Sequence, residues 1–213
     1  LTMIYTPFQK YMTEPNRKVV FGSKWPSFRG TIERGLPNFM GSDIDYTYLQ
    51  GTISQSIKIG TIGNTDYKAI VGKFINTNDL RYVDQKIFPR GDQWFFASLM
   101  ESMQIQDTTL TVRDFYYQLH VKHHFNGAIV NYIPLVKKLG IHAVVGASTL
   151  YIKESQYRYG EVYLGMEKTF KMQRSRIRLG VYFVEAKSNY SDIAPRIKFA
   201  VNRYSLRDKS WGY

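Results

Sequence analysis

The sequence predicts an all-β fold, a transmembrane antiparallel β-barrel, and three observations support this prediction. Apolar and polar side chains alternate along many segments, as in strands with two different faces. Most of these segments exceed the about 5–6 residues usual in soluble strands and reach the roughly 9–11 residues that cross a bilayer at a tilt. Aromatic residues gather near segment ends, as at Tyr151, Tyr157, Phe170 and Trp211, which is typical of interfacial girdles.

We expect strands at 17–23, 27–36, 45–58, 65–76, 113–125, 141–152, 157–170, 174–187 and 195–204. The clearest alternation lies in 113–125, where Phe115, Leu119 and Val121 fall on one face and His120 and Lys122 on the other. In 157–170, Val162, Leu164 and Met166 oppose Glu161 and Glu167. Further along, Ile177, Leu179, Val181 and Phe183 oppose Arg176 and Arg178, and Ile197, Phe199 and Val201 oppose Arg196 and Lys198. A soluble β-sandwich would turn the apolar face to a core, whereas a barrel turns it to lipid and lines its lumen with the polar face.

The strand count constrains the extent of the barrel. Bacterial single-chain barrels have an even number of strands, and the expected list is odd. Either a strand around 3–8 belongs to the list or the chain is the C-terminal part of a larger barrel, and we favour the second. The chain also begins at Leu1 without an initiator Met, which indicates a processed chain or a fragment.

The connections alternate between two sides of the membrane. Counting from the C-terminus places 188–194, 153–156, 77–112 and 37–44 outside, and 171–173, 126–140, 59–64 and 24–26 on the periplasmic side. Short periplasmic turns and one long external loop are typical of such barrels. In 126–140, the apolar run 133–136 is expected to form a folded cap at the periplasmic rim.

Composition excludes several function classes. The 213 residues carry Lys+Arg 29 against Asp+Glu 17, a net charge of +12, and no Cys, which excludes disulfides and thiolate chemistry. The basic excess could indicate nucleic acid, but Arg174, Arg176 and Arg178 recur at every second position on one strand face. We therefore expect these cations to line a lumen or meet lipid phosphates, and we expect no nucleic-acid partner.

Motifs for chemistry are weak. No catalytic or nucleotide-binding fingerprint is present, so we expect no enzyme, no catalytic residue and no cofactor. His120, His123 and His124 share one expected strand with His142 nearby, but only His120 and His124 face the same way and neither has thiolate ligands beside it. We interpret the histidines as polar residues of the lumen or rim, not as metal ligands.

The loop 77–112 is the most informative stretch, because a long connection without regular structure is usually functional. It contains Arg90 and Gly91 between apolar and aromatic residues. If the loop enters the lumen, Arg90 needs a carboxylate partner, since an unpaired buried cation is costly. Glu161 and Glu167 are the expected partners in a loop-to-lumen lock; an exposed Arg-Gly tip without a partner is the alternative.

A set of short motifs lies at 124–127, 133–135, 137–139, 143–147 and 159–165, with further motifs at 24–28, 33–35 and 72–74. Together they resemble a Bacteroidota outer-membrane family that joins a carboxypeptidase-regulatory-like N-terminal domain to a C-terminal region of unknown function. The C-terminal region is in turn similar to the barrel of the BamA-type assembly and translocation superfamily, usually sixteen-stranded. There the third external loop from the C-terminus enters the lumen with an Arg-Gly-aromatic tip, and 77–112 holds that place here. The tip differs, because Asp92 follows Gly91 and the first aromatic residue is Trp94.

The resemblance implies that residues 1–213 are the C-terminal part of a probable sixteen-stranded barrel in the bacterial outer membrane. It implies a role in assembling, translocating or displaying envelope proteins, with outer-membrane lipids including lipopolysaccharide, other envelope proteins and surface lipoproteins as partners. The seam strand would carry Ile197, Phe199 and Val201, and its edge could template an incoming strand. A passive scaffold subunit and a soluble, glycan-binding β-sandwich are the alternatives.

Overall fold

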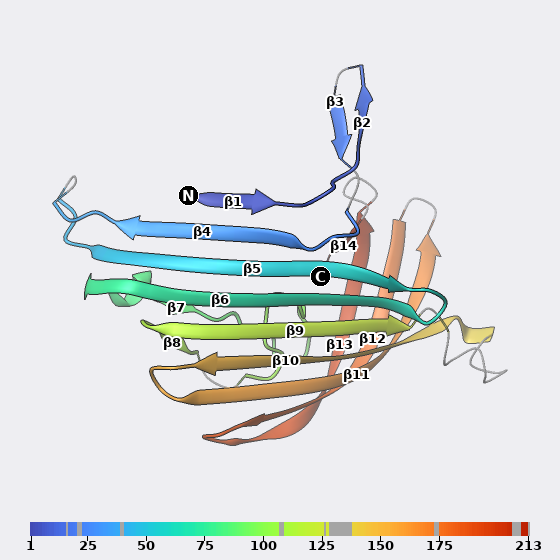
Figure 1. The fold of residues 1–213 in the computed structure, drawn as a ribbon. Helices are drawn as coiled ribbons and strands as arrows, with labels where there is room; N and C mark the ends of the chain where they lie inside the picture. Colours follow the sequence, from blue (N-terminus) through green and yellow to red (C-terminus); the bar gives the residue numbers. More distant parts are fainter. Residues whose placement is uncertain are drawn as a thin grey trace.

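A computed structural model describes residues 1–15, 17–20, 23–38, 41–106, 109–125, 127, 138–172, 175–205 and 210–212. This part of the chain is all-β and is dominated by one ten-stranded antiparallel sheet (Figure 1). In spatial order its strands are β1 (Thr2–Tyr5), β4 (Ser27–Gly35), β5 (Asp45–Ile59), β6 (Gly63–Asp79), β9 (Phe115–Phe125), β10 (Ile141–Ile152), β11 (Tyr157–Met172), β12 (Ser175–Ser188), β13 (Asp192–Ser205) and β14 (Ser210–Gly212).

Smaller elements complete the described fold. One hairpin joins β2 (Tyr11–Glu14) to β3 (Arg17–Val20), and inside the long loop β7 (Lys86–Ile87) pairs with β8 (Thr111–Val112). A single 3₁₀ turn, η1 (Tyr82–Asp84), precedes β7. The expected strand 17–23 is therefore a short hairpin strand outside the main sheet, and a strand does lie near 3–8, as β1.

The main sheet curls strongly about one side. In Figure 1, β4, β5 and β6 cross the front, whereas β12 and β13 stand behind them at a steep angle. The strands of this sheet lie side by side in chain order, and each pair of neighbours is antiparallel. In the described residues β1 and β14 end the strand order and do not pair with each other. The sheet is open here, and the closure expected of a barrel is not observed.

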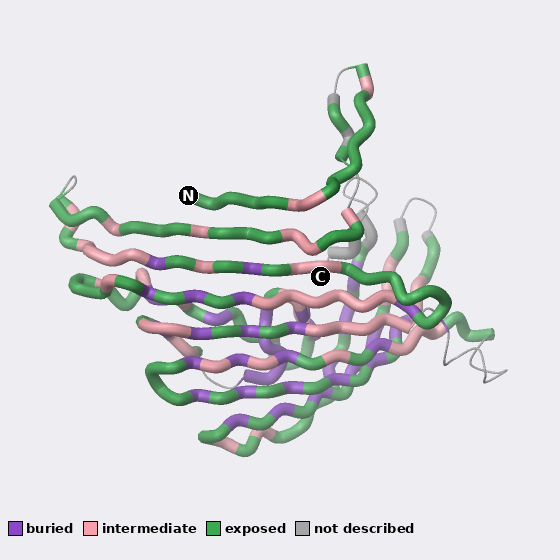
Figure 2. Tube along the Cα trace, viewed as in Figure 1, coloured by how far each residue is buried: buried purple, intermediate pink, exposed green. Residues whose placement is uncertain are grey.

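The two faces of the sheet have opposite character. Along β11 the outward side chains Val162, Leu164 and Met166 are 55%, 59% and 60% exposed, while the inward Tyr159 and Glu161 are 2% exposed. In β12, Val181 and Phe183 are exposed and Tyr182 and Val184 are buried, and the register places Tyr182 beside Gly165 of β11. Figure 2 shows the same alternation along the other long strands. The apolar residues face outward and many polar ones lie on the concave side, as the strand periodicity predicts.

The core lies between the concave face and the loop 77–112. Apolar side chains of the loop are buried there, among them Phe88, Phe96, Leu99, Met103 and Ile105. They pack against inward aromatic residues of the sheet. Phe88, for example, contacts the Tyr116 ring edge-on, with 4.9 Å between the ring centroids. The loop is therefore a packed layer on the inside of the sheet.

Candidate functional site

The strongest constellation of polar groups fixes the loop 77–112 to the concave face. Glu161 of β11 is buried, and its Oε2 accepts hydrogen bonds from the backbone N–H of Gln104 at 2.8 Å and from the Tyr159 hydroxyl at 2.7 Å. A longer contact joins the same oxygen to the N–H of Ile105 at 3.4 Å. Hydrogen bonds to a buried carboxylate are stronger than those between neutral groups, so Glu161 anchors the loop.

Lys198 of β13 holds the loop from the opposite side. Its side chain is fully buried, and its Nζ donates to the backbone carbonyls of Asp92 and Gln104. The peptide groups of Gln104 are thus clamped by charges of opposite sign, with the N–H on Glu161 and the C=O on Lys198. We call Glu161, Lys198 and Gln104 the loop clamp.

The Gln104 side chain extends the clamp within the loop. Its Oε1 accepts from the N–H of Ala97 at 3.0 Å, and its Nε2 donates to the carbonyl of Ala97 at 3.2 Å. This two-point contact mimics a strand pair and joins the two halves of the loop. Nearby, the N–H of Gly91 donates to the Met103 carbonyl at 2.5 Å.

Gly91 lies against this clamp. A Cβ atom there would stand 2.8 Å from the Gln104 carbonyl oxygen and 3.1 Å from Lys198 Nζ. The position therefore requires glycine for close approach. Arg90 beside it is exposed. The prediction joins Arg90 to Glu161 or Glu167, whereas the hydrogen bonds described at Glu161 come from Gln104, Ile105 and Tyr159.

Glu167 belongs to a second network further along β11. Its Oε2 lies 3.0 Å from His124 Nε2 and 3.2 Å from an Arg178 guanidinium nitrogen, and its Oε1 accepts from the Tyr182 hydroxyl. The two glutamates proposed for the lock therefore have different partners: Glu161 meets the loop, and Glu167 ties β9, β11 and β12 together.

The expected seam strand contacts the loop as well. On β13, the N–H of Phe199 donates to the Trp94 carbonyl at 3.0 Å, and the Phe199 carbonyl accepts from the N–H of Phe96 at 2.8 Å. Phe95 and Phe199 therefore form an isolated parallel β-bridge between the loop and β13. Ile197, Phe199 and Val201 all face outward and are exposed. Among the described residues, β14 pairs with Arg203–Ser205 of β13.

The turn that precedes this segment is capped by Asp92. Its carboxylate accepts from the N–H of Trp94 at 2.8 Å and of Phe95 at 2.9 Å. The hydrogen bonds from Phe95 and then Trp94 lower the pKa of Asp92 below its ordinary value, because they favour the charged form.

Two histidines of β9 bond to hydroxyl groups of the neighbouring strands. His120 bonds Ser148 at 3.0 Å and His123 bonds Thr65 at 2.8 Å. Among the described residues, no group of three or more His, Asp or Glu side chains is arranged to hold a metal ion. Arg174 and the expected cap at 133–136 lie outside the described residues. The part of the chain described here has no helix that is both long and apolar enough to span a membrane.

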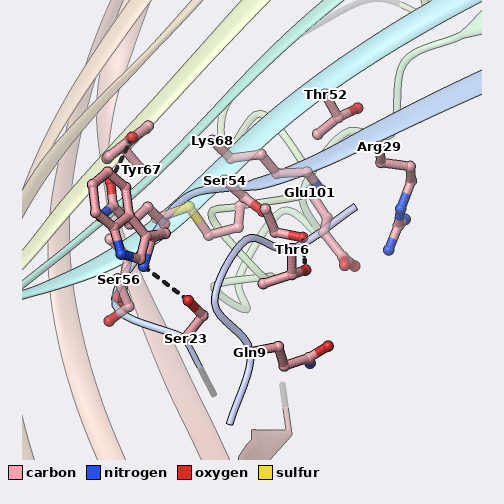
Figure 3. Close-up of a pocket in the computed structure, with 15 residues that line it drawn as sticks. Thr6, Gln9, Ser23, Arg29, Thr52, Ser54, Ser56, Tyr67, Lys68 and Glu101 are labelled. Carbon is pink, nitrogen blue, oxygen red and sulfur yellow. Dashed lines mark hydrogen bonds between the residues drawn. The ribbon is translucent and has the colours of Figure 1, made fainter. Parts of the chain in front are cut away.

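A polar cavity of about 540 Å³ lies between the N-terminal strands and the loop (Figure 3). Hydroxyl groups recur along its wall, and Arg29, Asp66, Lys68 and Glu101 add charges. Glu101 comes from the loop, so the loop reaches the concave side of β4–β6 as well as that of β11–β13. The sequence offered no signal for this cavity, because its wall comes from five separate segments.

The fold and the clamp define an all-β protein with a long loop fixed inside a curved antiparallel sheet. The chain belongs to the family described as "Family of unknown function (DUF5686) C-terminal domain", whose model matches residues 1–166. This confirms the resemblance to a C-terminal region of unknown function. No curated protein and no solved structure matches the chain.

Proposed function

We propose that this chain forms part of an outer-membrane β-barrel in the bacterial envelope and assists the assembly, translocation or display of other envelope proteins. The observation that carries the proposal is the outward face of β11–β13, where apolar side chains are exposed at every second position over 162–166, 179–183 and 197–201. Its neighbours would be outer-membrane lipids, including lipopolysaccharide, and its clients other envelope proteins such as surface lipoproteins.

Energetics favour lipid over water at this face. Burying one large apolar side chain contributes about 1.5–3 kcal/mol, and Val162, Leu164, Met166, Val181 and Phe183 are only a part of the outward set. Soluble monomers rarely expose a contiguous apolar surface larger than a few hundred Å². The strand lengths agree, because β11 has 16 residues and β12 and β13 have 14 each, more than the roughly 9–11 that cross a bilayer.

The edge of β13 supports the assembly role. An edge strand offers backbone donors and acceptors that can pair with an incoming strand. The backbone N–H and C=O of Phe199 bond to Trp94 and Phe96 of the loop. This part of β13 therefore pairs with a segment that is not a strand of the main sheet. A passive scaffold subunit is the second candidate, favoured by the loop that packs across the concave face and occupies this edge.

Extraction of the full-length protein from its native membranes tests the membrane part. We expect it to stay in the membrane pellet in carbonate and to need detergent for release. A Leu164→Arg change should reduce the inserted amount, because a cation on the lipid face costs about 2–4 kcal/mol at the midplane; Lys187→Arg is the matched control. Release without detergent would contradict both the assembly hypothesis and the scaffold hypothesis, and it would favour the soluble, glycan-binding β-sandwich.

Depletion in the native host tests the assembly part. We expect loss of surface-exposed lipoproteins and barrel proteins from the outer membrane, measured by quantitative proteomics of surface-labelled cells. An unchanged surface proteome, with the protein itself correctly inserted before depletion, would leave the scaffold role as the better account.

A further inference from the structure

An apolar groove of about 440 Å³ crosses the outward face of β10–β13. Apolar side chains of this face form its wall, chiefly Ile141, Met166, Phe170, Leu179 and Val181. The last four are exposed, so the groove is open to whatever surrounds the outward face. Because β11 and β12 are each paired with a strand on both sides, the groove does not depend on an edge of the sheet.

The strand register arranges these side chains in rows across the sheet. Met166 is paired with Val181 in one row, and both side chains are apolar. In the next row Lys168 lies between Ile141 of β10 and Leu179 of β12, and it also borders the groove. The groove therefore has a charged end, on the side where β11 turns into β12.

A second cation lies at the same end. Arg203 of β13 is exposed and pairs with Ile177, which pairs in turn with Phe170 of β11. The Lys168 side chain is half-buried, and its Nζ lies 5.1 Å from the centroid of the Phe170 ring, a distance typical of a cation–π contact. The ammonium of Lys168 is thus held at the groove, with the Arg203 row directly beyond it.

The acids of β10–β13 lie elsewhere. Within these strands they are Glu161, Glu167, Glu185 and Asp192. Glu161 bonds on the concave side, and Glu167 borders the groove but directs its carboxylate to the concave-side network with His124. Glu185 and Asp192 lie toward the opposite ends of β12 and β13. The charge at this end of the groove is therefore complementary to an anion.

We propose that the groove binds one anionic phospholipid, with an acyl chain along Met166, Leu179 and Val181 and the phosphate beside Lys168 and Arg203. The apolar wall accepts a chain of any lipid, whereas the cations select a negative head group. The expected topology places the turn after β11 on the periplasmic side, where the outer membrane carries phospholipid and not lipopolysaccharide. That the groove meets a membrane rests on the proposed function.

Lipid binding to the full-length protein in detergent micelles tests the head-group preference. The probes are phosphatidylglycerol and phosphatidylcholine with the same acyl chains, and native mass spectrometry measures the lipid-bound fraction. Each basic side chain near an anionic head group contributes about fivefold, so phosphatidylglycerol should bind roughly 25-fold more tightly. Lys168→Gln should lower this preference about fivefold, and Lys168→Arg should keep it. Lys187→Gln removes an exposed cation at the far end of β12 and is the matched control.

Filling the groove tests the acyl-chain site separately. Leu179→Trp places a larger ring in the groove and should weaken both lipids about tenfold, which equals the loss of about two buried methylene groups. Phe183→Trp enlarges an exposed side chain of the same strand that does not line the groove, so it should bind both lipids as the unmodified protein does.

Four results would overturn the proposal. They are equal binding of the two lipids, a preference that Lys168→Gln leaves unchanged, equal effects of the two Trp variants, and displacement of phosphatidylglycerol by an equal concentration of lipopolysaccharide. The carbonate extraction separates this outcome from the proposed function. A protein that stays in the membrane pellet but shows no head-group preference retains the membrane role and lacks the lipid site, whereas release without detergent defeats the membrane role whatever the micelles show.

Discussion

Removal of the Glu161 carboxylate should release the loop 77–112 from the concave face. In Glu161→Ala the N–H of Gln104 loses its buried acceptor, and the fully buried Lys198 loses the nearby negative charge. A hydrogen bond to a charged group contributes about 1.5–3 kcal/mol, and an uncompensated buried charge adds to the loss. Part of that loss is recovered when the opened loop is hydrated.

We therefore expect the free energy of loop opening to fall by about 2–4 kcal/mol. At 1.4 kcal/mol for each factor of ten, the opening equilibrium rises roughly 30- to 700-fold. Amide hydrogen exchange of residues 97–106 in detergent measures this directly, because exchange of buried amides follows the local opening equilibrium.

Two variants make the result interpretable. Glu161→Gln keeps an acceptor oxygen and the shape of the side chain, so its effect should be smaller than that of Glu161→Ala. Glu185→Ala removes an exposed carboxylate from β12 and should leave exchange in the loop unchanged. Exchange in Glu161→Ala within twofold of the unmodified protein would refute the role of Glu161 as the anchor.

Three further predictions address the same loop. Glu161→Lys should increase protease cleavage within 85–96 more than Glu161→Ala does, since two cations then meet at the clamp; unchanged cleavage contradicts this. Because the pKa of Asp92 is lowered in the folded chain, its cap is complete above the ordinary value of about 4 and is lost as pH falls through the lowered pKa. Trp94 fluorescence, followed in a Trp25→Phe, Trp211→Phe background, should report that transition and lose it in Asp92→Asn. Gly91→Ala should cost about 1–3 kcal/mol of loop stability, seen as faster exchange at Gln104, because its Cβ crowds the Gln104 carbonyl.

Strand periodicity predicted most of the sheet because each long strand has one exposed apolar face. The expected range 141–152 coincides with β10, and 157–170 falls two residues short of the end of β11. β2, β7, β8 and β14 were missed, and β1 entered only as the alternative around 3–8, since strands of two to four residues are too short to show alternation. Their pairing depends on the partner strand and not on their own sequence.

The site was predicted only in part, for a related reason. Glu161 was selected because it is an acid on the inward face, and its buried position agrees with that choice. Its partner is the backbone of Gln104, and a backbone N–H has no sequence signature. Lys198 also falls on the inward side of its expected strand, but the sequence gives no sign that a loop more than ninety residues earlier supplies its acceptors. The pairing of Arg90 with Glu161 or Glu167 stays a prediction.

The loop clamp also imposes a direction. A backbone N–H only donates and a backbone C=O only accepts, so the carboxylate must stand at the N–H of Gln104 and the ammonium at its C=O. Exchanging the two charges, with Glu161→Lys and Lys198→Glu together, keeps the net charge but turns an ammonium toward a donor and a carboxylate toward an acceptor. The double variant should therefore not recover the loop stability that either single variant loses. Glu161 and Lys198 therefore fix the direction in which the chain passes between them at Gln104.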